Sequence, residues 1–246
     1  MTWDEYYERY LTERKINLES FWKEISPGVY HPSNEDIQWL IQALEDEQRK
    51  WFVAFIVKKV AGSFPKRLKR VLLSPLIRAA VYERNPSLNR YFVEPCVAVF
   101  GYRQVIEALL DLVERGSNFE KAGAVNALYW AGFRLSFINA PNFSLEYATP
   151  ESQAAYDALT DLRLRKRCLF LREFVSNPNL DVRRSIIPHL VLNPSCYADE
   201  LKPLVLEAIE IARTHSDDYI RHRVEVQLGT ESLLKPLPHR EPNSER

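Results

Sequence analysis

Three short stretches of the sequence hold residue types that could do chemistry. The first, "SNPNLDVRRSIIPHL" (176–190), places two arginines, a histidine and an aspartate close together. These could bind an anion, or they could belong to a repeated structural element.

The second stretch is the basic run "RLRKRCLFLRE" (163–173), whose cations could lower the pKa of the Cys168 thiol and make it reactive. A buried small side chain on a helix is the favoured interpretation of Cys168, because the apolar residues around it follow a core pattern. Solvated faces are likewise the favoured interpretation of this run and of "PKRLKR" (65–70), although both could attract phosphates.

The third stretch is aromatic. "ALYWAGFRLSF" (127–137) holds Tyr129, Trp130, Phe133 and Phe137, more rings than one buried helix stripe needs. Tryptophan and tyrosine are favoured as interface anchors because they bury a large area and keep a polar group. The alternative is that the neighbouring insertion folds back and buries these rings.

Motifs of known catalytic sites are missing from the sequence. It has no GxxxxGK[ST] phosphate loop, no GxGxxG and no HExxH. His215 and His222 are seven residues apart, but no third ligand accompanies them. We therefore expect no metal and no cofactor.

Composition limits the possible partners and the compartment. Lys plus Arg equals Asp plus Glu at 33 each, whereas a dedicated nucleic-acid binder usually has a basic excess. The three cysteines form no CxxC pair, which is typical of the reducing cytoplasm. The longest apolar run, "WFVAFIV" (51–57), is too short to span a bilayer, so we expect no membrane association.

Apolar residues recur at helical spacing along most of the chain, as at Val105, Leu109, Leu110 and Val113. Glycine is scarce, at 7 residues, and no convincing period-2 strand is present. This pattern predicts an all-α protein.

The predicted helices come in pairs that repeat. "NPNLDVRRSIIP" (177–188) matches "NPSLNRYFVEP" (85–95), and a basic residue marks each predicted second helix. These marks are Arg49, Arg90, Lys121, Arg183 and Arg221. Successive marks lie 31–41 residues apart, except that Lys121 and Arg183 are separated by one repeat plus an insertion. Two-helix units of this length are typical of α-solenoids.

The paired helices, the Asp- or Asn-containing turn, and the pairs Val182-Arg183 and Ile220-Arg221 resemble HEAT repeats. The resemblance covers 33–229 and implies a right-handed α-solenoid of about five helix pairs. Pro95 and Pro188 depart from the pattern, because they fall inside predicted second helices. We expect residues 1–32 to form a capping helix (3–25) and a linker (25–33), an insertion near 135–150, and a disordered tail over 230–246.

The resemblance implies a non-catalytic scaffold that binds a protein or peptide on the concave face made by its second helices. Asp181 is predicted to cap one second helix, and Arg183 is predicted to reach a neighbouring unit, a structural task. In the functional alternative, the arginines face outward and bind acidic groups. The candidate partner-binding residues are Tyr129, Trp130, Arg134, Arg183, Arg184, Arg221 and Arg223.

An enzyme remains the second hypothesis. HEAT-like DNA glycosylases combine a basic concave face with aromatic residues and a carboxylate, and bilin lyase-like proteins handle a tetrapyrrole. Trp130 and the arginines could mimic the first two features of the glycosylases, but no carboxylate can be singled out. The zero net charge also argues against DNA.

Overall fold

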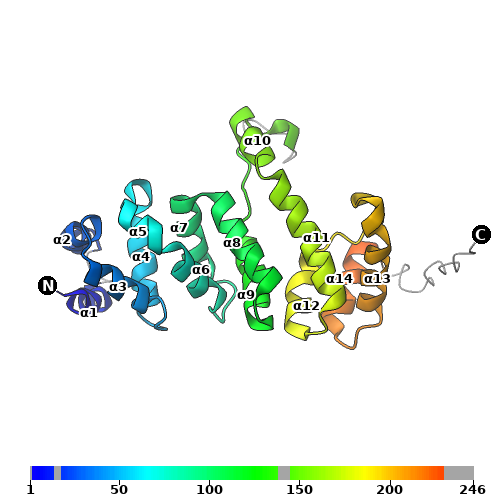
Figure 1. The fold of residues 1–246 in the computed structure, drawn as a ribbon, viewed down its shortest axis with the longest axis horizontal. Coiled ribbons are helices and arrows are strands. Elements are labelled where there is room, and N and C mark those ends of the chain that lie inside the picture. The colour runs from blue at the N-terminus through cyan, green and yellow to red at the C-terminus, as the bar shows by residue number, and fades with distance from the viewer. Residues whose placement is uncertain (1, 14–17, 138–144, 230–246) are drawn as a thin grey trace, which may run out of the picture. The chain divides into compact units, whose positions relative to one another are not determined.

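The structure is a computed structural model of the chain, and it describes residues 2–13, 18–137 and 145–229. Within these ranges the regular elements are helices, apart from one isolated β-bridge between Phe137 and Ala148 (Figure 1). The all-α prediction is therefore confirmed. The tail predicted to be disordered, 230–246, lies outside the described residues.

The described helices follow one another through short connections. In chain order they are α1 (Trp3–Glu13), α2 (Leu18–Tyr30), α3 (Asn34–Ala43), α4 (Lys50–Val60), α5 (Lys66–Val71), α6 (Leu73–Val81), α7 (Arg90–Phe100), α8 (Tyr102–Arg115), α9 (Asn118–Trp130), α10 (Pro150–Asp157), α11 (Thr160–Ser176), α12 (Leu180–Ile186), α13 (Lys202–Arg213) and α14 (Asp218–Leu228). Short 3-10 turns occur at Ala61–Ser63, Leu145–Tyr147, Ile187–His189, Pro194–Cys196 and Asp199–Leu201.

The chain packs as two compact units, Met1–Leu162 (unit 1) and Arg163–Arg246 (unit 2). The division falls inside α11, within the stretch 33–229 in which the sequence predicts repeats. Each unit is described by itself below.

Helices joined by short turns pair in both units. Unit 1 contains the pairs α3/α4, α6/α7 and α8/α9, and its second helices α4, α7 and α9 contact one another in that order. In unit 2, α12 follows α11 and α14 follows α13, and α12 contacts α14. All five basic marks lie in or next to a second helix: Arg49, Arg90, Lys121, Arg183 and Arg221.

The N-terminal region has two helices where the sequence predicts one helix and a linker. The α2 helix runs to Tyr30, through most of the predicted linker and past Pro27. Phe21, Ile25 and Val29 are fully buried and form a stripe at i, i+4 and i+8, so burial of this face continues the helix.

An aromatic cluster ties the N-terminal helices to the first pair. Trp3 stacks on Trp39 with ring centroids 5.7 Å apart, and Tyr10 lies 5.1 Å from Phe52. The indole N–H of Trp3 donates to Asp36 Oδ1 at 2.6 Å. Through these contacts the N-terminal helices cover part of α3 and α4.

Two helices of unit 1 cross closely at a glycine. A Cβ added to Gly123 of α9 would lie 2.1 Å from the carbonyl oxygen of Val81, at the end of α6. Only glycine allows the two backbones to approach this closely. The crossing joins the second and third pairs of unit 1.

The two prolines predicted inside second helices behave differently. Pro95 is buried within α7, as predicted. Pro188 is not inside α12, which ends at Ile186, because proline lacks the N–H that a further helical turn needs. It lies instead in the 3-10 turn Ile187–His189.

No helix in the described ranges combines the length and the apolar character needed to cross a membrane.

Candidate functional site

The seven predicted partner-binding residues fall in two places. Tyr129, Trp130 and Arg134 belong to unit 1, at and just beyond the end of α9. The other four belong to α12 and α14 of unit 2: Arg183, Arg184, Arg221 and Arg223. The two sets have different surroundings.

In unit 1, the aromatic residues join others that the sequence analysis did not select. Trp51 at the start of α4 lies 5.9 Å from Tyr91 at the start of α7, measured between ring centroids. The Arg90 guanidinium lies 4.9 Å from the Tyr91 ring and 5.8 Å from the Trp130 ring. The Trp130 and Tyr129 rings meet edge-on at 4.9 Å.

We call this row the aromatic ladder: Trp51, Arg90, Tyr91, Tyr129 and Trp130. It runs over the second helices α4, α7 and α9, with one arginine between its rings. Tyr129 is 64% exposed and Tyr91 is 41% exposed, so the ladder presents large ring faces to solvent. Exposed aromatic rings of this kind are typical anchors for a partner.

Polar contacts hold the ladder in place. The Trp130 indole N–H donates to the Pro86 carbonyl at 2.9 Å, and Arg90 Nη2 donates to the Tyr91 hydroxyl at 3.1 Å. Beyond the ladder, Arg134 pairs with Glu94 of α7 at 3.4 Å. The rings are therefore positioned in advance, which lowers the entropy lost when a partner binds.

A pocket of about 450 Å³ opens at the Trp51 end of the ladder. We call it the anchor pocket, and its lining residues are Tyr10, Trp51, Ala54, Phe55, Lys58, Leu88 and Tyr91. It lies among α1, α4 and the turn before α7. An aromatic-lined hollow with one cation on its wall suits an apolar side chain beside an acidic group.

The insertion leaves part of the aromatic stretch exposed. Phe133 is half-buried, with its ring centroid 4.8 Å from Tyr102 and 6.3 Å from Tyr156. Ser136 N donates to Ser152 Oγ at 2.9 Å, which ties the start of the insertion to α10. Tyr129 stays exposed, so the alternative in which the insertion buries the rings is wrong for Tyr129. The ring contacts of Phe133 come from α8 and α10 rather than from the insertion.

In unit 2, Arg183 has a structural task. Its Nε donates to the Phe174 carbonyl at 3.1 Å and its Nη2 to the Val175 carbonyl at 3.4 Å. The guanidinium also lies 5.7 Å from the Phe174 ring. Arg183 therefore donates to carbonyls at the end of the preceding helix α11. The prediction that it reaches a neighbouring repeat is wrong.

The same arrangement recurs at the same register. Arg183, Arg221 and Lys121 each lie four residues after the N-cap of their helix, which is Asn179, Asp217 and Ser117 respectively. Arg221 donates to the His215 carbonyl and pairs with Asp218. Lys121 makes a longer contact of 3.5 Å with the Glu114 carbonyl. Arg49 and Arg90 lie at or next to their N-caps instead, so the first two marks do not share this role.

The neighbouring residues of unit 2 are also engaged. Arg184 binds Asp217, with its Nε 3.1 Å from Oδ2, and this hydrogen bond holds the pKa of the Asp217 carboxyl below its ordinary value. Asn179 caps α12 by accepting from Val182 N at 3.1 Å, so the prediction that Asp181 is the cap is wrong. Arg223 is half-buried.

The basic run is partly packed against its own unit. Lys166 lies over the Phe170 ring at 5.3 Å, and burial lowers its pKa. Arg167 donates to the Cys196 carbonyl at 2.8 Å. Burial, with the charges of Lys166 and Arg223, lowers the pKa of nearby His189 to about 4. Cys168 is half-buried.

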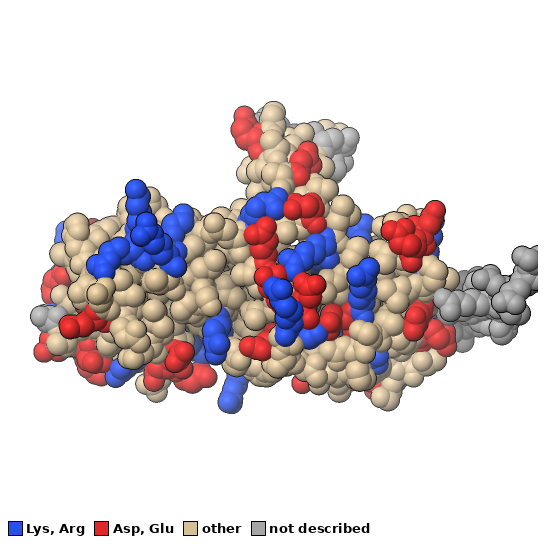
Figure 2. All heavy atoms as spheres, in the orientation of Figure 1, with Lys and Arg blue, Asp and Glu red and all other residues tan. Residues whose placement is uncertain are grey.

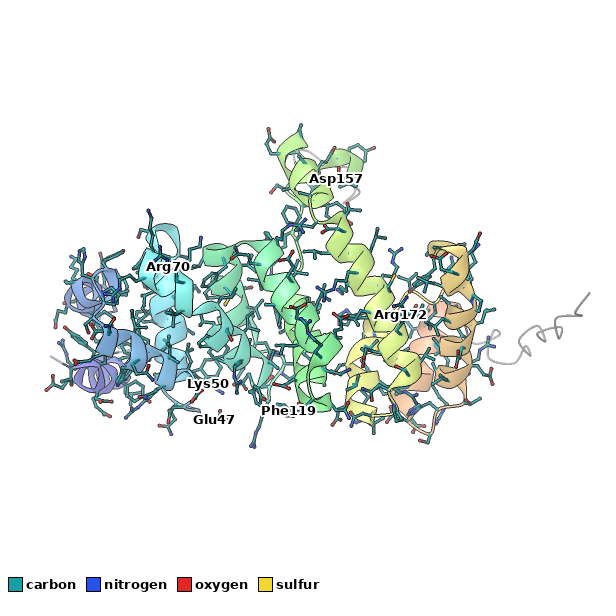
Figure 3. All side chains as sticks on the ribbon, in the orientation of Figure 1. Glu47, Lys50, Arg70, Phe119, Asp157 and Arg172 are labelled. Atoms are coloured by element: carbon teal, nitrogen blue, oxygen red, sulfur yellow. The ribbon has the colours of Figure 1, made fainter. Side chains whose placement is uncertain are left out.

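A second pocket of about 450 Å³ lies where the turns of the three unit 1 pairs meet. Its wall includes Lys50, which is 4% exposed and bonds Glu47 at 2.6 Å and Glu83 at 2.9 Å. Burial alone would lower the pKa of Lys50, but these two carboxylates outweigh it and raise the pKa. Figure 3 shows Glu47 and Lys50 near the start of α4 and Phe119 at the start of α9. We interpret Glu47, Lys50 and Glu83 as a structural ion cluster.

In the described ranges no group of three or more His, Cys, Asp or Glu side chains could hold a metal ion. Compared with known protein families, curated proteins and solved structures, the chain gives no significant match.

Trp51, Arg90 and Tyr91 are site residues that were not among the candidates predicted from the sequence. A signal was present, because Lys50-Trp51 and Arg90-Tyr91 both place a cation and a ring at the start of a second helix. Two such dipeptides in consecutive helix pairs put their rings on neighbouring positions of one surface.

Proposed function

We propose that the protein is a non-catalytic scaffold that binds a peptide segment of a protein partner along the aromatic ladder of unit 1. The ladder supplies exposed rings, and the anchor pocket takes one apolar side chain of the segment. Tyr129, Trp130 and Arg134 belong to this surface. Arg183 and Arg221 serve the scaffold.

We further propose that the helix pairs are HEAT-like repeats of a right-handed α-solenoid of about five pairs. The support is the order of contacts among α4, α7 and α9, the contact of α12 with α14, and the basic residue at one register in three second helices. Stacked second helices present an extended surface without built-in chemistry. The three free cysteines suit the cytoplasm as the place of action.

The single observation that carries the binding proposal is the Arg90 guanidinium between the Tyr91 and Trp130 rings, beside an open aromatic pocket. A guanidinium held close to two aromatic rings makes cation–π contacts, and arginine and aromatic side chains are typical interface anchors. A nucleic-acid site of the glycosylase kind is less well supported. A nucleic acid needs cations all along its path, whereas at the far end of the ladder Arg134 is paired with Glu94.

Selection from a random peptide library displayed on phage tests this function. Peptides enriched on the wild-type protein are synthesised, and their affinities are measured for the Tyr91→Ala/Tyr129→Ala variant. Tyr129 is 64% exposed and Tyr91 is 41% exposed, and neither belongs to the buried core, so the variant should fold. We expect apolar or aromatic anchors in the peptides and binding at least about tenfold weaker to the variant.

A matched control removes two exposed apolar side chains of unit 2, Leu164→Ala/Val226→Ala, which are 55% and 60% exposed in the native protein. It should bind the selected peptides within about twofold of the wild type. Equal binding to the wild type and the tyrosine variant, or no enrichment at all, would contradict the proposed function.

A further inference from the structure

One stretch of unit 1 carries positive charge with no acidic residue in it. Between Glu47 and Glu83 the sequence contains nine Lys and Arg and no Asp or Glu. Six of the nine lie within thirteen residues, over the last turn of α4 and the short helix α5. We call these six the α5 patch: Lys58, Lys59, Lys66, Arg67, Lys69 and Arg70.

All six side chains belong to exposed residues. Among the described residues, no carboxylate pairs with Lys58, Lys59, Lys66, Lys69 or Arg70. Figure 2 shows Lys and Arg gathered over α5 with no Asp or Glu among them, and Figure 3 labels Arg70 there. The overall charge of the chain is zero, so this gathering is a local property of one surface.

Contacts to the preceding helices fix the patch in place. Arg67 Nη1 donates to the Pro32 carbonyl and Nη2 to Asn34 Oδ1, both at 2.6 Å. The Tyr30 and Ser63 hydroxyls lie 3.2 Å apart, which joins the end of α2 to the turn before α5. The remaining cations of the patch are therefore carried on a fixed support.

The patch is continuous with the anchor pocket. Lys58 belongs to the patch and also lines the pocket. Lys59 Nζ lies 5.9 Å from the centroid of Phe55, another lining residue. A ligand whose apolar side chain fills the pocket therefore meets the free cations of the α5 patch at the pocket end of the surface. At the opposite end of the ladder it meets Arg134, which is already paired with Glu94.

We propose that the partner segment is an acidic peptide, with several Asp or Glu next to its apolar anchor, and that the α5 patch binds these carboxylates. This inference rests on the proposed function and names the partner's chemistry. The uneven charge of the surface favours such a peptide over a nucleic acid, because a nucleic acid is equally charged along its whole length.

Two labelled peptides serve as probes. One has five glutamates followed by Gly-Leu-Phe-Gly-Leu-Phe, and the other has glutamines in place of the glutamates. Affinities are measured by fluorescence anisotropy at low and physiological salt, with an oligothymidine of ten nucleotides as a third probe. On the wild type, we expect the glutamate peptide to bind at least about tenfold tighter than the glutamine peptide, and the advantage to shrink with salt.

The decisive variant is Lys69→Glu/Arg70→Glu, and its matched control is Arg84→Glu/Arg172→Glu, which changes the net charge equally at exposed residues elsewhere. The advantage of the glutamate peptide should vanish in the first and persist in the second. Loss in both variants, or in neither, would overturn the inference. So would tighter binding of oligothymidine than of the glutamate peptide.

The two proposals fail in different ways. If both peptides bind equally well and both depend on Tyr91 and Tyr129, the proposed function stands and the acidic-partner inference is wrong. If the glutamate peptide needs the α5 patch but is unaffected by Tyr91→Ala/Tyr129→Ala, the ladder is not the docking surface. If neither peptide binds, the acidic-partner inference is wrong, and the phage selection decides the proposed function separately.

Discussion

Arg90 in unit 1 and the arginines of the second helices in unit 2 do different work. In unit 1, Arg90 lies at the first turn of α7, between two aromatic rings on an open surface. In unit 2, Arg183 and Arg221 lie one turn further into their helices and donate to backbone carbonyls near the end of the preceding helix. A shift of three residues along the helix therefore separates a cation available to a partner from one used by the fold.

The comparison explains why repetition alone is a poor guide to function. Five basic marks, one for each predicted second helix, predict one shared role, but the role depends on the distance from the N-cap. A residue four positions after the cap can reach back over the turn, whereas a residue at the first position points along the surface toward the next second helix.

The positions of the tryptophans allow the two units to be followed separately. All five, Trp3, Trp22, Trp39, Trp51 and Trp130, belong to unit 1. Tryptophan fluorescence therefore reports unfolding of unit 1, while far-ultraviolet circular dichroism reports both units.

The largest effect is expected from Gly123→Ala. The added Cβ would meet the Val81 carbonyl, so α6 and α9 must separate, and we expect the free energy of unfolding to fall by about 3 kcal/mol. Urea denaturation followed by tryptophan fluorescence measures it. Gly62→Ala is the control, since no atom lies within 4 Å of its added Cβ, and its effect should stay within about 0.5 kcal/mol. A neutral Gly123→Ala would contradict the close crossing in unit 1.

The next effect belongs to unit 2. Arg183→Met removes the donors to two carbonyls, and we expect a loss of about 2.5 kcal/mol in the free energy of unfolding. Circular dichroism should show the loss, while the tryptophan transition stays in place. Arg172→Met, at an exposed position of α11, should change little. An unchanged circular dichroism transition for Arg183→Met would remove the contrast between the units.

Acid should weaken unit 2 through His189. Its pKa lies near 4 in the folded protein against an ordinary value of 6.5, so the unfolded chain takes up the proton first as pH falls. The contribution of neutral His189 to the free energy of unfolding is therefore present above about pH 6.5 and is lost as the pH falls toward 4. We expect about 2 kcal/mol of this loss between pH 7 and pH 5.

Urea titrations at the two pH values, followed by circular dichroism, measure this loss. His189→Gln should abolish most of it, whereas His31→Gln, at an exposed position of unit 1, should not. An equal loss of stability in wild type and His189→Gln would show that other groups carry the acid sensitivity.

The smallest effect sharpens the unit 1 side of the comparison. Arg90→Lys keeps the charge but loses the planar group that lies by the Tyr91 and Trp130 rings. Binding of the phage-selected peptides should weaken about threefold, with no change in the tryptophan unfolding transition. A lysine that binds as well as the arginine would show that charge alone matters at this position.

Much of the fold could be predicted from sequence, because helical periodicity and paired turns are local properties. Helix α3 and the apolar face of α8 follow directly from the spacing of their apolar residues. The run through 25–30 could not be predicted, because Pro27 and Gly28 suggest a linker and only tertiary burial of Ile25 and Val29 outweighs them.

The candidate site was predictable only in part. Tyr129 and Trp130 stand out by composition, but the ladder needs Trp51 and Tyr91 from two other helices, and their approach depends on how the pairs pack. The carbonyl contacts of Arg183 depend on a turn of three residues between α11 and α12, which sets the reach of the side chain.

Hydrogen–deuterium exchange with a phage-selected peptide at saturation tests the central claim most directly. We predict new protection at the turn and first residues of α7 (86–92) and at the end of α9 (127–131), with no change over 179–186 and 215–222 of unit 2. Protection confined to the unit 2 segments, with unit 1 unchanged, would contradict the account.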